Sequence, residues 1–271
     1  MMRKILWMGL AAMAGTLPAR AVEVELGARG GLWFGDLSGD VKVQSASIPG
    51  SRLTYTGLGM DTRETIPTGE VYFRVGESGK PPRHLASLRY WEQTYRGQTT
   101  LGQSITFKDV TYAASTTVSS RLTFKELDLR YAYDFWQGKP FARAVDGRPS
   151  AAWGIFGVKG IGIETELFSQ ALGATEKNAR APVPVLGAGG RWALGRRLGV
   201  EAQAVGMAVS LSDTTVRFYE AEAMARWDFS RYLALEAGWR RWSLDYDMDG
   251  STDVDGKAVI EGVTVGLAGR F

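Results

Sequence analysis

The chain has 271 residues, no Cys and a formal net charge of +3. Without Cys it has no disulfides and no thiolate metal site. Three basic residues and no acidic ones precede residue 22, so the rest of the chain has as many basic residues as its 29 acidic ones. A neutral chain gives no argument for a nucleic-acid partner.

Residues 1–21 predict a signal peptide that is cleaved after Ala21. Two basic residues precede an apolar run that ends at Gly15, and the segment closes with the A-x-A pattern of residues 19–21. The apolar run is too short to cross a bilayer as a helix, and no later stretch is long enough either. Residues 22–271 are therefore expected to form one exported domain.

Ten segments of this domain are predicted as strands, and most of them alternate apolar and polar residues with the period of two that is typical of a strand. The clearest places Leu127, Leu129 and Tyr131 opposite the charged residues between them. The faces of the fifth segment cannot be assigned. In chain order the ten segments are 22–35, 70–76, 84–95, 122–135, 153–168, 183–194, 198–211, 216–229, 232–246 and 259–271.

The last segment has one apolar face and one small or polar face, and it ends the chain on the aromatic Phe271. This is typical of the closing strand of an outer-membrane barrel, whose apolar face meets lipid. The fold class is predicted as all-β, a transmembrane antiparallel up-and-down β-barrel of about ten strands, with eight as the alternative. A soluble lipocalin-like barrel, with apolar residues inside, is the competing architecture.

Long and short connections alternate along the chain, as expected when both termini lie on the periplasmic side. The long ones, at 36–66, 97–117, 169–181, 212–215 and 247–258, are expected to be extracellular. The periplasmic ones are expected at 77–83, 136–150, 195–197 and 229–232.

Aromatic residues at strand ends predict two interfacial belts. The periplasmic belt would hold Tyr133, Phe135, Trp136, Trp153, Trp192, Trp227, Phe229, Tyr232 and Phe271. The other belt would hold Trp33, Phe34, Tyr90, Phe168, Tyr219, Trp239 and Trp242.

Several segments resemble an uncharacterised outer-membrane β-barrel family that is catalogued with GlyGly-type sorting tails. They are LSGDVK, TFKDVTYAASTTVSSRLTFKELDLRYAYDF, GAGGRWAL…LGVEAQAVG, YLALEAGWRRWSLDYDMDG and DVDGKAVIEGVTVGLAGRF. The resemblance runs over nearly all of the mature chain. It implies a barrel in the outer membrane and no activity, substrate or catalytic residue.

Charged residues on the inward faces are the first candidate for function. They could line a selective pore or relay protons, or they could pair with one another and fill a narrow lumen; we favour the second interpretation. The set includes Glu126, Asp128, Arg130, Glu220, Glu222, Arg226, Glu236 and Arg240.

An acidic stretch near the C-terminus predicts weak calcium binding at the cell surface. Asp245, Asp247, Asp249 and Asp253 lie at alternating or nearby positions with Gly between them, and hard cations prefer several oxygen ligands around a tight turn. The twelfth position of the pattern is Gly256 instead of the usual bidentate Glu, so a solvated acidic loop is the alternative.

His84 is the only His in the chain. Barrel enzymes such as omptin proteases and lipid A acyl-modifying enzymes use a His near the outer rim, but His84 follows a periplasmic turn, where a general base would face the wrong side of the membrane. We therefore expect no enzyme and no cofactor, Ca²⁺ apart. The predicted function is a structural or surface-interacting barrel of the cell outer membrane, in contact with outer-membrane lipid and with surface polysaccharide or ions. A narrow channel is the alternative, and a barrel enzyme acting on lipid or peptide comes third.

Overall fold

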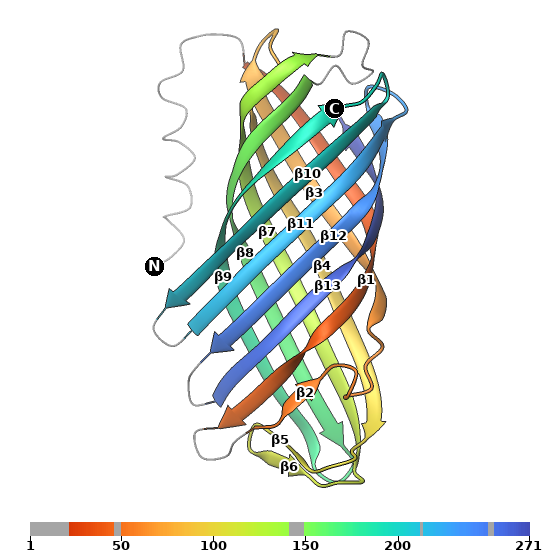
Figure 1. The fold of residues 1–271 in the computed structure, drawn as a ribbon, viewed down its shortest axis with the longest axis vertical. Coiled ribbons are helices and arrows are strands. Elements are labelled where there is room, and N and C mark those ends of the chain that lie inside the picture. The colour runs from red at the N-terminus through yellow and green to blue at the C-terminus, as the bar shows by residue number, and fades with distance from the viewer. Residues whose placement is uncertain (1–21, 46–49, 141–148, 212–213, 249–251) are drawn as a thin grey trace.

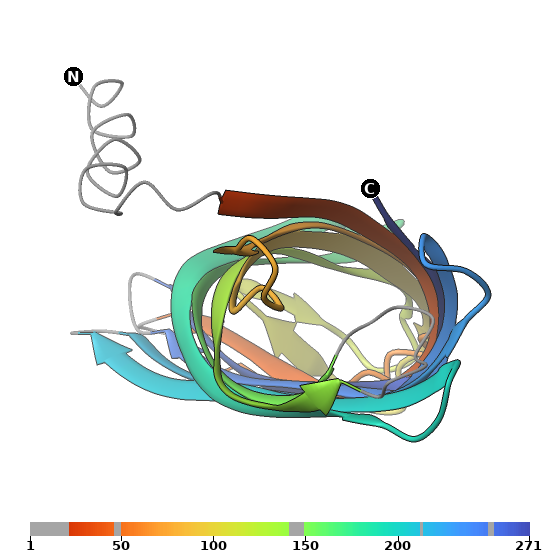
Figure 2. The same ribbon diagram turned by 90° about the horizontal axis from the view of Figure 1, so that it is seen from above.

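In a computed structural model, the chain forms a closed barrel of ten long strands (Figures 1 and 2). The structure describes residues 22–45, 50–140, 149–211, 214–248 and 252–271. The barrel strands are β1 (Val22–Ser45), β3 (Arg63–Glu77), β4 (His84–Thr100), β7 (Thr117–Pro140), β8 (Pro149–Ser169), β9 (Gly173–Ala193), β10 (Leu198–Leu211), β11 (Thr214–Asp228), β12 (Leu233–Met248) and β13 (Thr252–Arg270). Three short strands accompany them: β2 (Arg52–Thr54), β5 (Ile105–Phe107) and β6 (Val110–Tyr112).

Each barrel strand pairs antiparallel with the barrel strands before and after it in the chain, and β13 pairs with β1 to close the sheet. The closing register runs from Gly27 opposite Arg270 to Ser45 opposite Thr252. This confirms the predicted all-β, antiparallel, ten-stranded barrel, and the eight-stranded alternative is wrong. The seam is tight at Gly262, where a Cβ would lie 1.8 Å from the carbonyl oxygen of Phe34.

The two ends of the barrel differ in their connections. The end that holds Val22 and Phe271 has short connections at 78–83, 194–197 and 229–232, and we call it the terminal end. The opposite end, which we call the loop end, holds β2 and the β5–β6 hairpin (Figure 1). The predicted long and short connections therefore lie at opposite ends. Among the described residues, no helix is long and apolar enough to cross a bilayer.

About halfway along each strand, the apolar side chains change from the outward to the inward face, and the polar side chains change the opposite way. Strand β7 shows this most clearly. Nearer the terminal end, Leu127 and Leu129 point outward and are exposed, while Glu126 and Asp128 point inward and are buried. Nearer the loop end the order is reversed: inward Phe124 and its apolar neighbours are buried, and the outward positions are polar. The strand alternates throughout, but its apolar face changes sides.

The other strands make the same exchange at the same level. In β12, outward Trp239 gives way to Arg241, and inward Arg240 gives way to Trp242. The terminal half therefore has an apolar outside and a charged inside, whereas the loop half has a polar outside and an apolar core. Over the terminal half, the outward column that begins at Tyr219 of β11 and ends at Phe229, just after the strand, covers about ten residue steps. At about 3.3 Å per residue and a tilt of about 40° this is about 25 Å, the height of a lipid-facing band.

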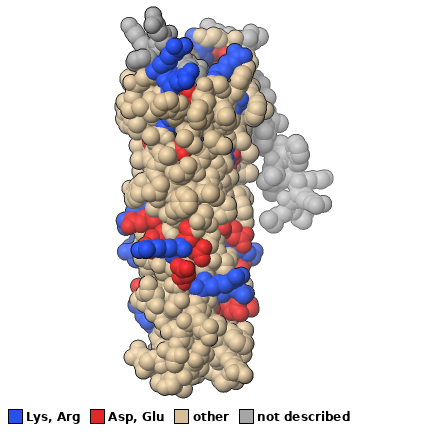
Figure 3. Space-filling view, turned by 90° about the vertical axis from the view of Figure 1, so that its right-hand side faces the viewer, with Lys and Arg blue, Asp and Glu red and all other residues tan. Residues whose placement is uncertain are grey.

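The outer surface makes this exchange visible. On the face seen in Figure 3, Lys, Arg, Asp and Glu gather in a belt across the barrel, with a wide band of mostly other residues between the belt and the terminal end. The apolar side chains of that band include Leu26, Phe73, Leu129, Trp227 and Leu267, all of them exposed. An uncharged band bounded by a charged belt is what a bilayer and its headgroups require of a barrel exterior.

Three predicted loops are largely strand. β1 runs on to Ser45 in place of a loop from residue 36, β9 begins at Gly173 within the predicted loop 169–181, and β13 begins at Thr252 within the predicted loop 247–258. Their outward residues are polar because they belong to the loop half, so they look like solvated loops in the sequence. Their inward residues include apolar ones that are buried or packed against the core, such as Leu37, Val41, Ala181 and Ala258.

Three members of the predicted aromatic belts were placed wrongly. Trp33 and Trp242 lie inside the barrel with an exposure of 0%, and Trp153 packs inward against the buried core. The remaining members of both belts are exposed, including Phe34, Tyr90 and Trp239. The predicted signal peptide, residues 1–21, lies outside the described residues.

Candidate functional site

The lumen of the terminal half holds a network of buried charges where it meets the loop half. We call this network the charged core. Seven side chains from five strands make it up, and all seven are at most 8% exposed. They are Arg89 of β4, Glu126, Asp128 and Arg130 of β7, Lys159 of β8, Glu220 of β11 and Arg240 of β12.

Lys159 is at the centre of the charged core, with an exposure of 0%. Its Nζ lies 2.8 Å from Glu126 Oε1, 2.6 Å from Asp128 Oδ2 and 2.7 Å from Glu220 Oε2. Oxygens of these three carboxylates lie within 4.8 Å of one another, a spacing that could hold a metal ion. The ammonium group of Lys159 already contacts all three carboxylates, so it occupies the position that a metal ion would take.

Arginine contacts extend the network across the barrel axis. Arg130 Nη2 lies 2.5 Å from Asp128 Oδ2 and 2.7 Å from Glu220 Oε2, which joins β7 to β11, two strands that are not neighbours in the sheet. Arg89 reaches Glu220 at 3.1 Å, and Arg240 reaches it at 3.2 Å. A buried charge is tolerated only when it is paired, and here the pairing also closes the lumen.

Further ion pairs continue the network toward the terminal end. Arg226 lies 3.0 Å from Asp228 and 2.8 Å from Glu236, while Arg29 lies 3.3 Å from Glu201. Arg89 also reaches Glu222 at 3.2 Å. All eight charges named in the sequence prediction are therefore inward, and the structure joins each of them to a partner.

Three tryptophans lie over the loop-end side of the charged core, and we call them the tryptophan layer. Trp91 Nε1 donates to Glu126 Oε1 at 3.0 Å, and Trp242 Nε1 donates to Glu126 Oε2 at 2.6 Å. Trp33 stacks edge-on with Trp91 at 5.8 Å and receives the guanidinium of Arg240 over its ring at 4.7 Å. The layer supplies hydrogen-bond donors to the carboxylate of Glu126. It also separates the charged core from the apolar side chains nearer the loop end.

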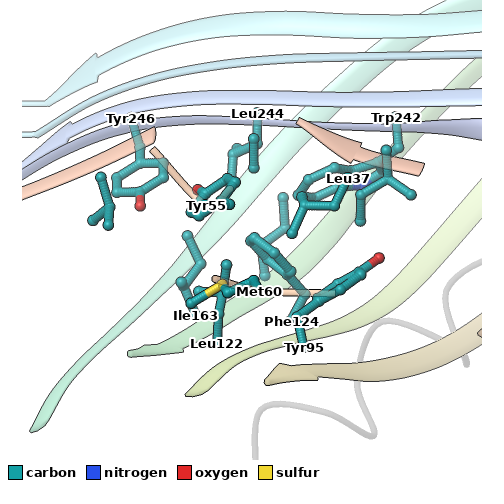
Figure 4. Packing of buried hydrophobic residues seen from close by; sticks show 14 of the residues in the cluster. Leu37, Tyr55, Met60, Tyr95, Leu122, Phe124, Ile163, Trp242, Leu244 and Tyr246 are labelled. Carbon is teal, nitrogen blue, oxygen red and sulfur yellow. The ribbon is translucent and has the colours of Figure 1, made fainter. Parts of the chain in front are cut away.

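The loop half is filled with apolar side chains, and Figure 4 shows them meeting from several elements. Barrel strands contribute inward residues such as Leu122, Phe124 and Leu244. Tyr55 and Met60, which follow β2, also pack inside, as do residues of the β5–β6 hairpin. We call this cluster the apolar plug. It is a hydrophobic core of the kind that a soluble barrel has.

Little space is left in the lumen. Two small cavities, of about 40 Å³ and about 50 Å³, lie within or beside the charged core. Arg29, Glu70 and Arg89 border both. Spaces of this size hold one or a few waters and no larger solute. In the described part of the chain, the charged core, the tryptophan layer and the apolar plug thus occupy the lumen one after another.

The predicted calcium residues do not share one loop. Asp245 and Asp247 are outward residues of β12, and Asp253 is an outward residue of β13, where its carboxylate accepts a hydrogen bond from Gln44. Asp249 lies outside the described residues. Calcium binding by this hairpin stays a prediction.

His84 lies on the outer surface at the terminal end, as the first residue of β4. Its Nδ1 is 2.5 Å from the hydroxyl of Tyr131, and its ring lies 5.2 Å from that of Tyr133. None of these three is inside the lumen. The arrangement is an aromatic contact on the outer face of the barrel.

The sequence analysis missed Lys159 and the role of the tryptophans. Lys159 lies in the segment whose faces could not be assigned, because Gly157, Gly160 and Gly162 interrupt the alternation there. The face of Lys159 could have been predicted from its spacing from Ile155, Ile161 and Ile163. All four are odd-numbered, and the structure places all four inward.

No family model and no curated protein matches the chain. Among solved structures it is similar to the outer membrane protease OmpT from Escherichia coli, with a TM-score of 0.54 and 12% identity over 95% of this chain and 99% of that one. Further matches include Ail from Yersinia pestis in complex with the heparin analogue sucrose octasulfate, with a TM-score of 0.34, 10% identity and coverage of 92% and 99%. Another is the transport unit of the autotransporter AIDA-I from Escherichia coli, with a TM-score of 0.37, 11% identity and coverage of 98% and 97%.

The likeness to OmpT concerns the fold alone, and the fold is that of an outer-membrane β-barrel. The resemblance to the sorting-tail family stays a prediction.

Proposed function

We propose that this chain is a non-conducting, non-enzymatic protein of the Gram-negative outer membrane. In this proposal the terminal half spans the bilayer, and the loop half stands outside the cell as a rigid head that displays its surface to ions or polysaccharide. The single observation that carries the proposal is the buried charge network around Lys159, which joins strands on opposite sides of the lumen.

The apolar plug supports the same conclusion from the other half of the barrel. A pore for ions or small solutes needs a continuous wet path, whereas Leu122, Phe124 and Met60 are buried in a packed core. The polar exterior of that half supports its position in water. A barrel enzyme would need a general acid–base site that opens at the outer rim, and that site would have to lie within this packed apolar head.

Planar-bilayer recording tests the closed lumen. Purified protein, refolded in detergent and inserted into the bilayer, is expected to give no stable unitary conductance under conditions in which a general porin conducts. A reproducible unitary step would select the narrow channel instead. Heat-modifiable migration on gels establishes that the inserted chain is folded.

Membrane fractionation tests the location separately. The mature chain is expected in the outer-membrane fraction, and protease added to whole cells is expected to reach only the loop end. Recovery of folded mature protein from the soluble periplasm, without detergent, would reject the proposed location.

A further inference from the structure

Four neighbouring strands, β4, β7, β8 and β9, present their outward residues in continuous rows that cross from one strand to the next. The last apolar row consists of Tyr90, Leu127, Gly160 and Pro182, each directly opposite the next. Polar rows begin immediately beyond it toward the loop end. These four strands thus carry a sharp boundary between a lipid-facing surface and a charged one.

The first polar row contains Glu92, Lys125, Gly162 and Arg180. Gly162 has no side chain, so it leaves a notch between the two cations; a Cβ there would lie 3.7 Å from Lys125 and 3.9 Å from Arg180. Lys125 and Arg180 share Glu164 as an acceptor, at 3.1 Å and 3.6 Å. These pairs are open to water, where they are weak.

In the third polar row, two arginines lie side by side on β4 and β7, and two glutamates lie side by side on β8 and β9. Arg96 lies directly opposite Arg121, and Glu166 lies directly opposite Glu176. Arg121 is 3.0 Å from Glu166, but Arg96 has no ion pair among the described residues. Like charges directly opposite each other destabilise a sheet. Two adjacent guanidinium groups are therefore an arrangement that an anion such as phosphate would stabilise.

The heights of the two rows identify the kind of anion. Lys125 is two residues beyond Leu127, about 5 Å above the apolar edge once the strand tilt is included. Arg121 is six residues beyond Leu127, about 15 Å above that edge by the same estimate. A headgroup layer is only about 5–7 Å thick, so a phospholipid phosphate reaches the lower row alone. A glycolipid with phosphate at its base and on its outer sugars reaches both.

We propose that this outward face binds a phosphorylated glycolipid of the outer leaflet, with one phosphate in the notch over Gly162 and another on Arg96 and Arg121. The binding site, which we call the glycolipid face, comprises both rows of β4, β7, β8 and β9. The inference rests on the proposed outer-membrane location. It does not depend on whether the lumen conducts.

Native mass spectrometry of the detergent-folded protein tests the proposal. The probes are a rough-form lipopolysaccharide that carries both base and core phosphates, phosphatidylglycerol, and inorganic phosphate. A saturable one-to-one adduct is expected with the lipopolysaccharide, at lower concentration than with phosphatidylglycerol. Replacing two cations, as in Lys125→Gln with Arg180→Gln, is expected to weaken binding roughly 30-fold, from about 1 kcal/mol per cation and 1.4 kcal/mol per tenfold.

Two further variants separate the site from general charge. Gly162→Leu keeps every charge but fills the notch, and it is expected to weaken binding as well. The matched control is Arg241→Gln, which removes the first outward charge beyond the apolar residues of β12, 2.7 Å from Glu261, and is expected to leave binding unchanged.

Three outcomes would overturn the proposal. They are equal affinity of the cation variants and the wild type, equal affinity for phosphatidylglycerol, and full competition by inorganic phosphate, which would indicate a free-anion site. All substituted side chains are outward, and heat-modifiable migration confirms that each variant is folded. The binding assay uses purified protein in detergent. Its result can therefore be interpreted whatever the conductance and fractionation tests show.

Discussion

Replacing Lys159 by Ala is expected to be among the most destabilising single substitutions in the barrel. The ammonium group meets Glu126, Asp128 and Glu220 at 2.6–2.8 Å and is fully buried. At an effective dielectric constant of about 20, one such contact is worth about 6 kcal/mol. Burial of the ammonium costs several kcal/mol in return, and Arg130 and Arg240 still face the carboxylates after the substitution. The expected net loss is therefore about 3–5 kcal/mol, the range for breaking a buried ion pair.

Urea unfolding in lipid vesicles, followed by tryptophan fluorescence, measures this loss. Lys159→Met separates charge from volume, because Met refills most of the space. It is expected to recover less than half of the loss, since the three carboxylates stay unpaired. A Lys159→Ala variant within 1 kcal/mol of the wild type would refute the reasoning, because it would mean that the carboxylates are not held by the buried cation.

The same variant offers a second readout. Without the ammonium, three carboxylate oxygens within 4.8 Å of one another form a site that suits a hard cation. Millimolar Ca²⁺ is expected to restore about 1–3 kcal/mol of stability to Lys159→Ala by preferential binding to the folded state. No such gain is expected for the wild type at this site.

Three other substitutions or conditions probe separate parts of the fold. Trp242→Phe keeps the ring stacking but loses the bond to Glu126, and it is expected to cost about 1.5–3 kcal/mol in the same urea assay. Gly262→Ala places a Cβ against the carbonyl of Phe34, and it is expected to block closure of the seam, seen as loss of heat-modifiable migration. Burial in the apolar plug raises the pKa of Tyr55 well above its usual value of 10.0. Stability is therefore expected to be unaffected by this group below pH 10 and to fall above it, because only the unfolded chain ionises there; alkaline absorbance titration of tyrosinate measures this.

Matched controls accompany these experiments. Trp239→Phe alters an outward tryptophan of the same strand and is expected to stay within about 0.5 kcal/mol of the wild type. Gly30→Ala adds a Cβ where nothing lies within 4 Å, and closure is expected to be normal. A Trp242→Phe variant as stable as Trp239→Phe would contradict the importance of the tryptophan layer.

The strand count and the closing strand could be predicted because the lipid-facing band alternates strongly. Leu127 and Leu129, set against Glu126 and Asp128, identify an outward and an inward face without further information. The loop half could not be predicted in the same way. There the outward residues are polar, so stretches such as 36–45 look like loops, although Leu37 and Val41 are fully buried.

The charged core was predictable in part. Alternation placed its carboxylates and arginines inside, but it gave no information on which strands face each other across a closed barrel. Lys159 lies among glycines that conceal the face of its strand, and Trp33 and Trp242 were assigned to a belt because aromatic residues near strand ends usually lie there. The error on the two tryptophans comes from assuming that one face of a strand keeps one character along its whole length, whereas Lys159 was missed because glycines carry no side chain that marks a face.

The exchange of faces also sets how deep the molecule can sit. A rigid displacement along the barrel axis by one row toward the terminal end would bring Lys125 into hydrocarbon and strip lipid from Phe271. A displacement toward the loop end would lift the last apolar residues, Tyr90 and Leu127, out of hydrocarbon, so both directions are opposed. The position of the molecule along the bilayer normal is thus set by the barrel wall itself, and a bilayer of another thickness would have to deform to fit it.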